Sequence, residues 1–484
     1  MASLVLPAGL LVGGALASCG GDGPPVIGDA PVVMVHTDQA DIDEGRLDLE
    51  DLIERGRALM VASFNTLDGA GRPESTGLGV PRPRREAPDN FNRISGPDSG
   101  SCFACHNMPR AGGGGDNVAN AFVLAQRLPL VNFDGGDGDG SSSQTLKTVG
   151  NERNTLGMFG SGFIELLARE MTADLHAIRD EAIALATDTR TSVFLPLASK
   201  GVPFGWITAL PDGSVETDRV EGVDTDLVVK PFHQKGVDVS LRSFTTESLN
   251  HHHGMQPVEL FGDGIDADGD GVVNEVTRGD VTALVIFQAT LPVPGQVLPG
   301  DGRARQAVEQ GRELFDAVGC AVCHVPELPL NDPVFTEPNP LNPPGNLQVG
   351  DVSRPFRVDL TSEGPGPHLK RGEDGVVMVP AFTDLKRHRM GDALDNEALE
   401  QNGVPTDSWL TRKLWGMASE PPFLHHGRAT LISEAVLAHG GEARESRDAF
   451  RSLSHDERAA LIEFLKSLQV LPEGEDDLVI TARE

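Results

Sequence analysis

The sequence predicts a mainly α-helical protein of two similar domains with long loops and small β elaborations. The first observation behind this is helical periodicity, clearest where Ser454 opens a capping box and Leu461, Phe464, Leu465 and Leu468 follow at helical spacing. The second is that one five-residue cysteine pattern occurs twice, at Cys102 and at Cys320. The third is composition: 56 Gly and 34 Pro among 484 residues indicate long ordered loops between the helices.

Several segments are assigned by their patterns. We expect helices over 46–64, 160–188, 238–256 and 303–318, and a last helix after Ser454. Residues 191–230 are expected to form short strands and turns. The length and the apolar content, 39% of residues, allow substantial cores.

The two cysteine patterns are Cys102, Cys105, His106 and Cys320, Cys323, His324, each C-x-x-C-H. This spacing is the attachment signature of c-type haem, because one short turn presents two thiols to the haem vinyl groups and the adjacent His to the iron. A zinc ribbon would place its two C-x-x-C units much closer in sequence, and a disulfide pair would not need the His. We therefore expect two covalent haems c, with His106 and His324 as proximal ligands.

The fifth cysteine belongs to an export signal. Residues 3–18 are small and apolar, too short to span a bilayer, and end in Leu16-Ala17-Ser18-Cys19, which resembles the lipobox of bacterial lipoproteins. The resemblance implies lipidation of Cys19 and a periplasmic or extracytoplasmic, membrane-anchored protein. The alternative is an ordinary signal peptide with an incidental Cys. The segment departs from the lipoprotein pattern in that no Lys or Arg precedes the apolar run.

The expected organisation is a signal peptide over 1–19, a tether over 20–45, an elaborated N-terminal haem domain over 46–295 and a C-terminal haem domain over 296–484. In the second half, a helix, the haem motif, loops and a terminal helix resemble the small cytochrome c fold, in which the first and last helices cross beside the haem. A net charge of -32 excludes nucleic acid as a partner and favours a small molecule or a basic redox protein.

The stretch from Trp415 to Ala443 resembles the di-haem cytochrome c peroxidase superfamily. The resemblance is closest to the di-haem oxidoreductase branch, also labelled thiol oxidoreductases, to which the rubber-cleaving oxygenases are related. In that superfamily a Pro-aromatic-x-His-x-Gly segment, here Pro422–Gly427, precedes a helix whose end carries the second axial ligand. That position is His439, with Met390 as the alternative. The chain has no Tyr, which excludes the Tyr ligation of the related maturation enzymes.

The sequence offers several candidate side chains for the distal side of the first haem. His251, His252 and His253 are consecutive in a predicted helix. Consecutive side chains on a helix point about 100° apart, so only one of the three imidazoles can face a given iron. We choose His252 as the distal ligand or pocket base, with a solvated His cluster as the alternative. The resemblance also implies a Glu that assists peroxide cleavage, and Glu165 is the candidate. A plain helix-surface carboxylate is the alternative for Glu165.

A calcium site is also predicted. Asp266, Asp268, Asp270 and Asn274 stand at positions 1, 3, 5 and 9 of an EF-hand-like loop, although position 12 is Thr rather than Glu. An ordinary acidic turn is the alternative.

Four further residues are candidates that the sequence cannot place. Arg428 and Arg242 are candidates to pair with haem propionates, and Trp206 or Trp415 to lie between the haems.

The leading functional hypothesis is an exported di-haem oxidoreductase of peroxidase type. One haem would transfer electrons, and the other would act on peroxide or dioxygen. The alternatives are a non-enzymatic di-haem electron carrier and a haem-dependent oxygenase that cleaves an unsaturated hydrocarbon. Protein ligands on both sides of an iron favour electron transfer, whereas an open position favours chemistry.

Overall fold

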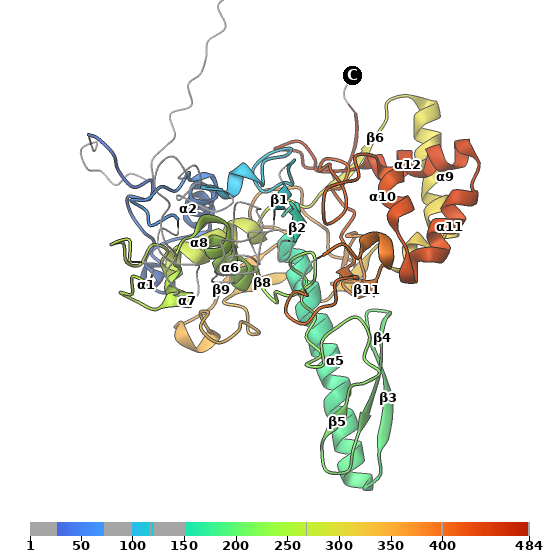
Figure 1. Cartoon of the computed structure of the whole chain (residues 1–484), viewed down its shortest axis with the longest axis horizontal. Helices are drawn as coiled ribbons and strands as arrows, with labels where there is room; N and C mark the ends of the chain where they lie inside the picture. The colour runs from blue at the N-terminus through green and yellow to red at the C-terminus, as the bar shows by residue number, and fades with distance from the viewer. Residues whose placement is uncertain are drawn as a thin grey trace, which may run out of the picture.

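The computed structural model describes residues 27–71, 99–116, 118–120, 151–267, 269–397 and 400–482. The expected signal peptide, Cys19 and the candidate calcium ligand Asp268 lie outside these residues. Within the described ranges, helices alternate with short strands that form six sheets of two or three strands each (Figure 1). The fold is therefore mixed, and the expectation of a mainly α-helical fold was too narrow. The reason is that the long loops pair with one another as short strands.

The expected helices are present, with small shifts at their ends. They are α2 (Leu49–Val61), α5 (Ser161–Thr189), α6 (Leu241–His253), α9 (Gly302–Ala317) and α12 (His455–Ser467). The structure also contains α8 (Arg278–Ala289). The shorter helices are α1 (Gln39–Asp43), α7 (Val258–Phe261), α10 (Ile432–Ala438) and α11 (Arg444–Ser452). The capping box of α12 is confirmed, because the Glu457 N–H donates to the Ser454 hydroxyl and the Ser454 N–H to the Glu457 carboxylate.

The first core forms where α2 crosses α8. Gly56 lies at the crossing, and a Cβ there would be 2.1 Å from the Ala283 carbonyl oxygen, so a side chain would separate the helices. Every residue of α8 from Gly279 to Ala289 is buried. This core therefore supports α6, which packs on α8 and carries the His251–His253 cluster.

In the C-terminal part, α9 and α12 cross at Gly311. A Cβ on Gly311 would lie 2.0 Å from the Ala460 carbonyl oxygen. Phe315, Phe382 and Phe464 pack edge to face around this crossing, with ring centroids 5.5–6.0 Å apart. The crossing follows the expected order of helix, cysteine motif, loops and terminal helix.

Residues 161–230 build an arm that projects from the body (Figure 1). Its strands are β3 (Val193–Ser199), β4 (Val202–Ala209) and β5 (Val215–Glu216), in one antiparallel sheet that packs on the far half of α5. On the outer face of this sheet, exposed Trp206 stacks on Phe194 with ring centroids 4.6 Å apart. Trp206 thus lies on the arm, and the suggestion that it separates the haems was wrong.

The remaining strands are short. They are β1 (Val118–Asn120), β2 (Glu152–Asn154), β6 (Gly295–Leu298), β7 (Leu328–Leu330), β8 (Val334–Glu337), β9 (Phe356–Asp359), β10 (Val377–Val379), β11 (Arg387–Arg389), β12 (Ser408–Leu410), β13 (Leu468–Gln469) and β14 (Val479–Thr481). Buried Phe335, Val358 and Val377 from these strands join the first core rather than the α9–α12 core. The domain boundary between 295 and 296 stays a prediction.

Candidate functional site

Both cysteine motifs adopt the same local structure. Cys102–Ala104 and Cys320–Val322 are single 3₁₀ turns. The following histidines, His106 and His324, donate their backbone N–H to the first cysteine's carbonyl at 2.9 and 3.0 Å. Each turn therefore carries two thiols and delivers a histidine directly behind them.

The two histidines are also oriented in the same way. Nδ1 of His106 lies 3.0 Å from the Gly113 carbonyl oxygen, and Nδ1 of His324 lies 3.1 Å from that of Phe382. An Nδ1–H that donates to a carbonyl fixes the ring and leaves Nε2 as the electron pair for a metal. Burial lowers the pKa of each imidazole to about 4, so both are neutral at pH 7, as a metal ligand must be.

The thiols are buried as well. Burial raises the pKa of Cys102 to about 12 and that of Cys320 to about 11. These groups are therefore thiols rather than thiolates at neutral pH. Two thiols on one turn beside a neutral histidine are the donor set of covalent haem attachment.

The first motif opens onto a cavity of about 190 Å³ lined by Cys102, Cys105 and His106 on one side and by α6 on another. His252 and His253 both line it, whereas His251 does not. The His253 ring is held by Nδ1, 2.7 Å from the Ser99 carbonyl oxygen, and its Nε2 lies 3.3 Å from Cys102 Sγ. The structure thus brings the chosen His252 to the same cavity as His106 and adds His253, which sequence reasoning had not separated from it.

The second motif opens onto a larger cavity of about 530 Å³, a size typical of ligand pockets. His324 and His439 both line it, with ring centroids 6.5 Å apart. Two His–metal bonds of about 2 Å each, plus the distance from each nitrogen to its ring centre, require roughly 6 Å. The His439 Nδ1 lies 2.8 Å from the Ala435 carbonyl oxygen, which again leaves Nε2 for a metal. Met390, the alternative ligand, lines the same cavity.

One wall separates the two cavities. Gln234, Leu410, Thr411 and Arg412 line both of them. The two motifs, far apart in sequence, therefore face a common partition.

Trp409 lies beside this partition and lines the second cavity. Its ring stacks on that of His425, with centroids 3.6 Å apart, and the Lys235 ammonium lies 3.5 Å from the ring centre. Trp415, which we had considered for a place between the haems, is instead buried against Gly160 and lines neither cavity. Sequence reasoning missed Trp409, because nothing local distinguishes it from the other Trp residues.

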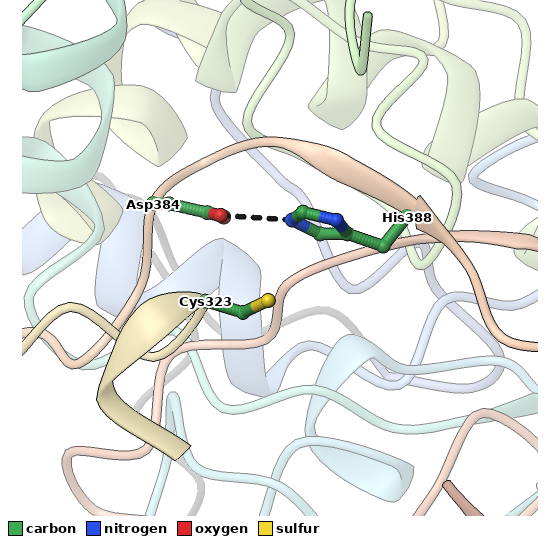
Figure 2. Close-up of side chains that lie close together, drawn as sticks. All are labelled: Cys323, Asp384 and His388. Atoms are coloured by element: carbon green, nitrogen blue, oxygen red, sulfur yellow. Dashed lines mark hydrogen bonds and ion pairs between the residues drawn. The ribbon is translucent and has the colours of Figure 1, made fainter. Parts of the chain in front are cut away.

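His388 lines the second cavity and faces the carboxylate of Asp384 (Figure 2). His388 Nε2 lies 2.8 Å from Asp384, and its Nδ1 lies 2.7 Å from Glu442. Burial would lower the pKa of His388, but the hydrogen bonds to Asp384 and to the Cys323 thiol raise it to about 11. His388 is therefore a cation, unlike the neutral His324 and His439.

Glu165 does not reach the first cavity. Its buried carboxylate accepts the Leu241 N–H at 2.6 Å and the Asn339 amide at 2.7 Å, and it pairs with Arg169. Its neighbour Ile164 lines the cavity, because the two side chains point to different faces of α5. Glu165 therefore stabilises the fold, and the expectation that it assists peroxide cleavage is not supported.

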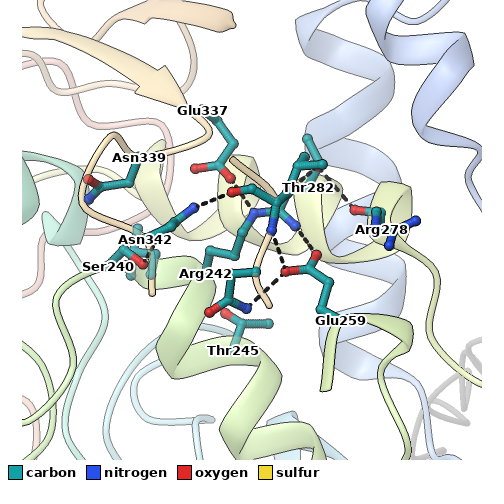
Figure 3. Close-up of polar contacts among 12 residues, drawn as sticks. Ser240, Arg242, Thr245, Glu259, Arg278, Thr282, Glu337, Asn339 and Asn342 are labelled. Carbon is teal, nitrogen blue, oxygen red and sulfur yellow. Dashed lines mark hydrogen bonds and ion pairs between the residues drawn. The ribbon is translucent and has the colours of Figure 1, made fainter. Parts of the chain in front are cut away.

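Arg242 is likewise committed to the fold (Figure 3). Its fully buried guanidinium pairs with Glu259 and Glu337 and donates to Thr282. It therefore cannot serve a haem propionate. Arg428, the other candidate, is mostly exposed and pairs with Glu152.

The contacts of the described residues do not support the predicted calcium site. Asp266 accepts the backbone N–H groups of Gly269 and Gly271, and the Asn274 amide donates to Asp263. Asp270 accepts the Val272 N–H. These contacts are those of a closed acidic turn, and the calcium site stays a prediction.

Part of the chain matches the model of a known protein family. Residues 361–468 match the family model described as "Di-haem oxidoreductase, putative peroxidase". This part of the chain is therefore similar to the di-haem oxidoreductases. The match includes His388, Trp409 and His439 and confirms the predicted resemblance, and it supports a redox role that uses haem.

Two other comparisons do not assign a family to the chain. Among solved structures, the xenon-pressurised hydrazine synthase of Kuenenia stuttgartiensis is 14% identical, with a TM-score of 0.27, over 57% of this chain and 76% of that one. No curated protein matches the chain. Among the described residues, none of the helices has the length and apolar character needed to cross a bilayer.

Proposed function

We propose that this protein is an exported di-haem c-type oxidoreductase of the peroxidase type. In this proposal the second haem transfers electrons, and the first acts on peroxide or dioxygen. The observation that carries it is the pair of cavities that share one wall, each with two thiols on a single turn and a neutral histidine whose Nδ1 is held by a carbonyl.

The residues fit two covalent haems. Cys102 and Cys105 would hold the first through thioether bonds, and Cys320 and Cys323 would hold the second. Bound haem iron supplies reversible one-electron chemistry and, where a coordination position is open, a binding site for small oxidants. The paired apolar and imidazole linings of both cavities match this group.

The second site has the features of electron transfer. His324 and His439 lie at a ring separation that matches two ligands of one iron. If His324 and His439 both held one iron, this site would leave no place for substrate. Two imidazole ligands would also lower the reduction potential of a haem iron relative to His/Met ligation, which suits a site that transfers electrons.

The first site has the features of a reaction cavity. Besides His106, His252 and Lys413 line it, and Leu241, Phe244 and Leu249 give it an apolar surface. An imidazole nitrogen of His252 would hold the proton that a bound peroxide gains or loses, a role suited to His near neutral pH. Gln234 and Arg412, which line both cavities, would form the short path between the two sites.

Low-temperature EPR of the oxidised protein with both haems attached tests this assignment. We expect one high-spin and one low-spin ferric signal. His439→Ala should convert the low-spin signal to high spin, whereas His455→Ala, at an exposed helix start, should change neither signal. Two low-spin signals in the wild type would favour the electron carrier instead.

The apolar lining of the first cavity favours one second candidate, the oxygenase that cleaves an unsaturated hydrocarbon. The test is incubation of the reduced protein with dioxygen and a polyisoprene emulsion, followed by mass spectrometry of carbonyl products. Products that depend on the Cys102 and Cys105 thiols would support it. Peroxide turnover without such products would support the peroxidase.

Export and anchoring complete the proposal. Removal of residues 1–18 and lipidation of Cys19 would place the protein on the outer side of a bacterial inner membrane or in the periplasmic leaflet of an outer membrane. The acidic surface would then favour a basic redox partner. Cys19→Ala should move the protein from the membrane fraction to the soluble periplasmic fraction.

A further inference from the structure

A group of three potential metal ligands lies in the wall of the first cavity. His233 and Asp238 come from the loop that precedes α6, and Glu247 comes from α6 itself. One ligand atom from each residue lies within 4.8 Å of the other two. His233 also lines the first cavity, so the group stands directly behind that cavity's surface. None of the three residues belongs to a motif that the sequence alone makes recognisable.

The loop is built to bring its two ends together. Phe232 and Asp238 form an antiparallel bridge, in which the Phe232 N–H donates to the Asp238 carbonyl at 3.2 Å. His233 follows the first end of this bridge, so its side chain lies beside that of Asp238. Phe244 of α6 contacts the His233 ring edge to face at 4.9 Å and holds its orientation. Loop and helix therefore meet at the group.

Two buried atoms of the group lack hydrogen-bond partners. His233 Nε2 and Asp238 Oδ2 are both buried without one, and the side chains are 10% and 6% exposed. The two atoms are 2.8 Å apart, yet they are not aligned as donor and acceptor. Buried polar atoms in folded proteins nearly always have partners, and those that do not are frequently aimed at an ion or a water.

The charges of the group also call for a cation. Asp238 and Glu247 together bring two carboxylates beside one imidazole, and like charges held this close repel each other. The lysine nearest in sequence, Lys235, does not offset them. Its ammonium donates to the carbonyl oxygens of Pro405, Thr406 and Ser408 and pairs with Glu397.

We propose that His233, Asp238 and Glu247 bind one divalent transition-metal ion in the wall of the first cavity. One imidazole nitrogen and two carboxylate oxygens suit Zn²⁺ and Mn²⁺, and the nitrogen disfavours Ca²⁺, which takes oxygen ligands. The ion would neutralise the two carboxylates and hold the His233 ring in the wall of the cavity that contains His106. The site needs no haem to form, so it stands apart from the proposed function.

Metal analysis of the full-length protein with both haems attached tests the site. After chelation, the protein is equilibrated with ZnCl₂ and desalted, and zinc and iron are counted by mass spectrometry. We expect one zinc for every two iron atoms. His233→Ala and Asp238→Asn should each weaken zinc binding by at least about 100-fold, because even outer-shell partners of a metal contribute 10- to 100-fold. His455→Ala, on an exposed helix start, should retain the zinc.

Further measurements separate the site from its competitors. Zinc-edge absorption spectroscopy of the wild type should show nitrogen and oxygen ligands at about 2.0 Å and no sulfur, which tests the proposal even if the variants fail to fold. Zinc that is lost in Asp384→Asn but kept in His233→Ala would place the ion at the group of Cys323, Asp384 and His388 and overturn the proposal. Displacement of zinc by millimolar Ca²⁺, or no zinc at all, would also overturn it and leave His233 and Asp238 as an ion pair.

Discussion

The crossing of α9 and α12 at Gly311 permits a sharp test of the packing around the second haem site. In Gly311→Ala, the new Cβ would lie 2.0 Å from the Ala460 carbonyl oxygen and 2.8 Å from the Phe464 Cβ, whereas real Cβ contacts essentially never fall under 3.0 Å. The helices must therefore separate by roughly 1 Å, and the nearest obstacle is backbone, which no rotamer change can remove. Overpacking of this kind costs about 3 kcal/mol. The better helix propensity of Ala returns about 1 kcal/mol, so we expect a net loss of about 2 kcal/mol.

The matched control is Gly302→Ala on the same helix, where a Cβ would meet nothing within 4 Å. This change should be neutral or stabilise by up to about 1 kcal/mol. Urea unfolding of both variants, followed by circular dichroism, measures the difference in the free energy of unfolding. If Gly311→Ala were as stable as Gly302→Ala to within about 0.5 kcal/mol, which is the normal range for surface changes, the close helix crossing would be refuted.

Three further changes test the buried charges. Arg242→Met should destabilise the protein by about 3–5 kcal/mol, because it leaves Glu259 and Glu337 buried without their cation; thermal unfolding and soluble yield measure this, and a wild-type melting temperature would contradict it. Burial lowers the pKa of Lys413 to about 8 from 10.5, so between these pH values the folded state binds fewer protons than the unfolded state and the free energy of unfolding rises with pH. The wild type should therefore gain about 1.4 kcal/mol per pH unit relative to Lys413→Met from pH 8 to 10, and parallel stability curves would show that Lys413 stays charged. Glu165→Gln should lower the free energy of unfolding by about 1–3 kcal/mol, because a charged hydrogen-bond acceptor is lost, while peroxide turnover per haem at 25 °C stays unchanged. A large loss of turnover in a fully folded variant would restore Glu165 to a catalytic role.

Features encoded in contiguous residues were predictable from the sequence. The two C-x-x-C-H motifs, the helices over 160–188 and 303–318, and the capping box at Ser454 depend on neighbours within about four positions. His439 was expected instead from the family resemblance, as the end of the helix that follows the segment Pro422–Gly427, and the structure places its ring 6.5 Å from that of His324. Local chemistry is sufficient here because each feature is complete within one turn or one helix.

Features that depend on contacts between distant segments were decided by the tertiary structure. Glu165 was expected at the first cavity, but Asn339 and the backbone of Leu241 hold it on another face of α5. His233 and Trp409, which nothing local distinguishes, reach the cavity walls because loops far apart in sequence pack together. The sequence by itself determined which residues could attach haem. Only the packing decided which other side chains face those sites, since the direction of a side chain is set by the core that its element covers.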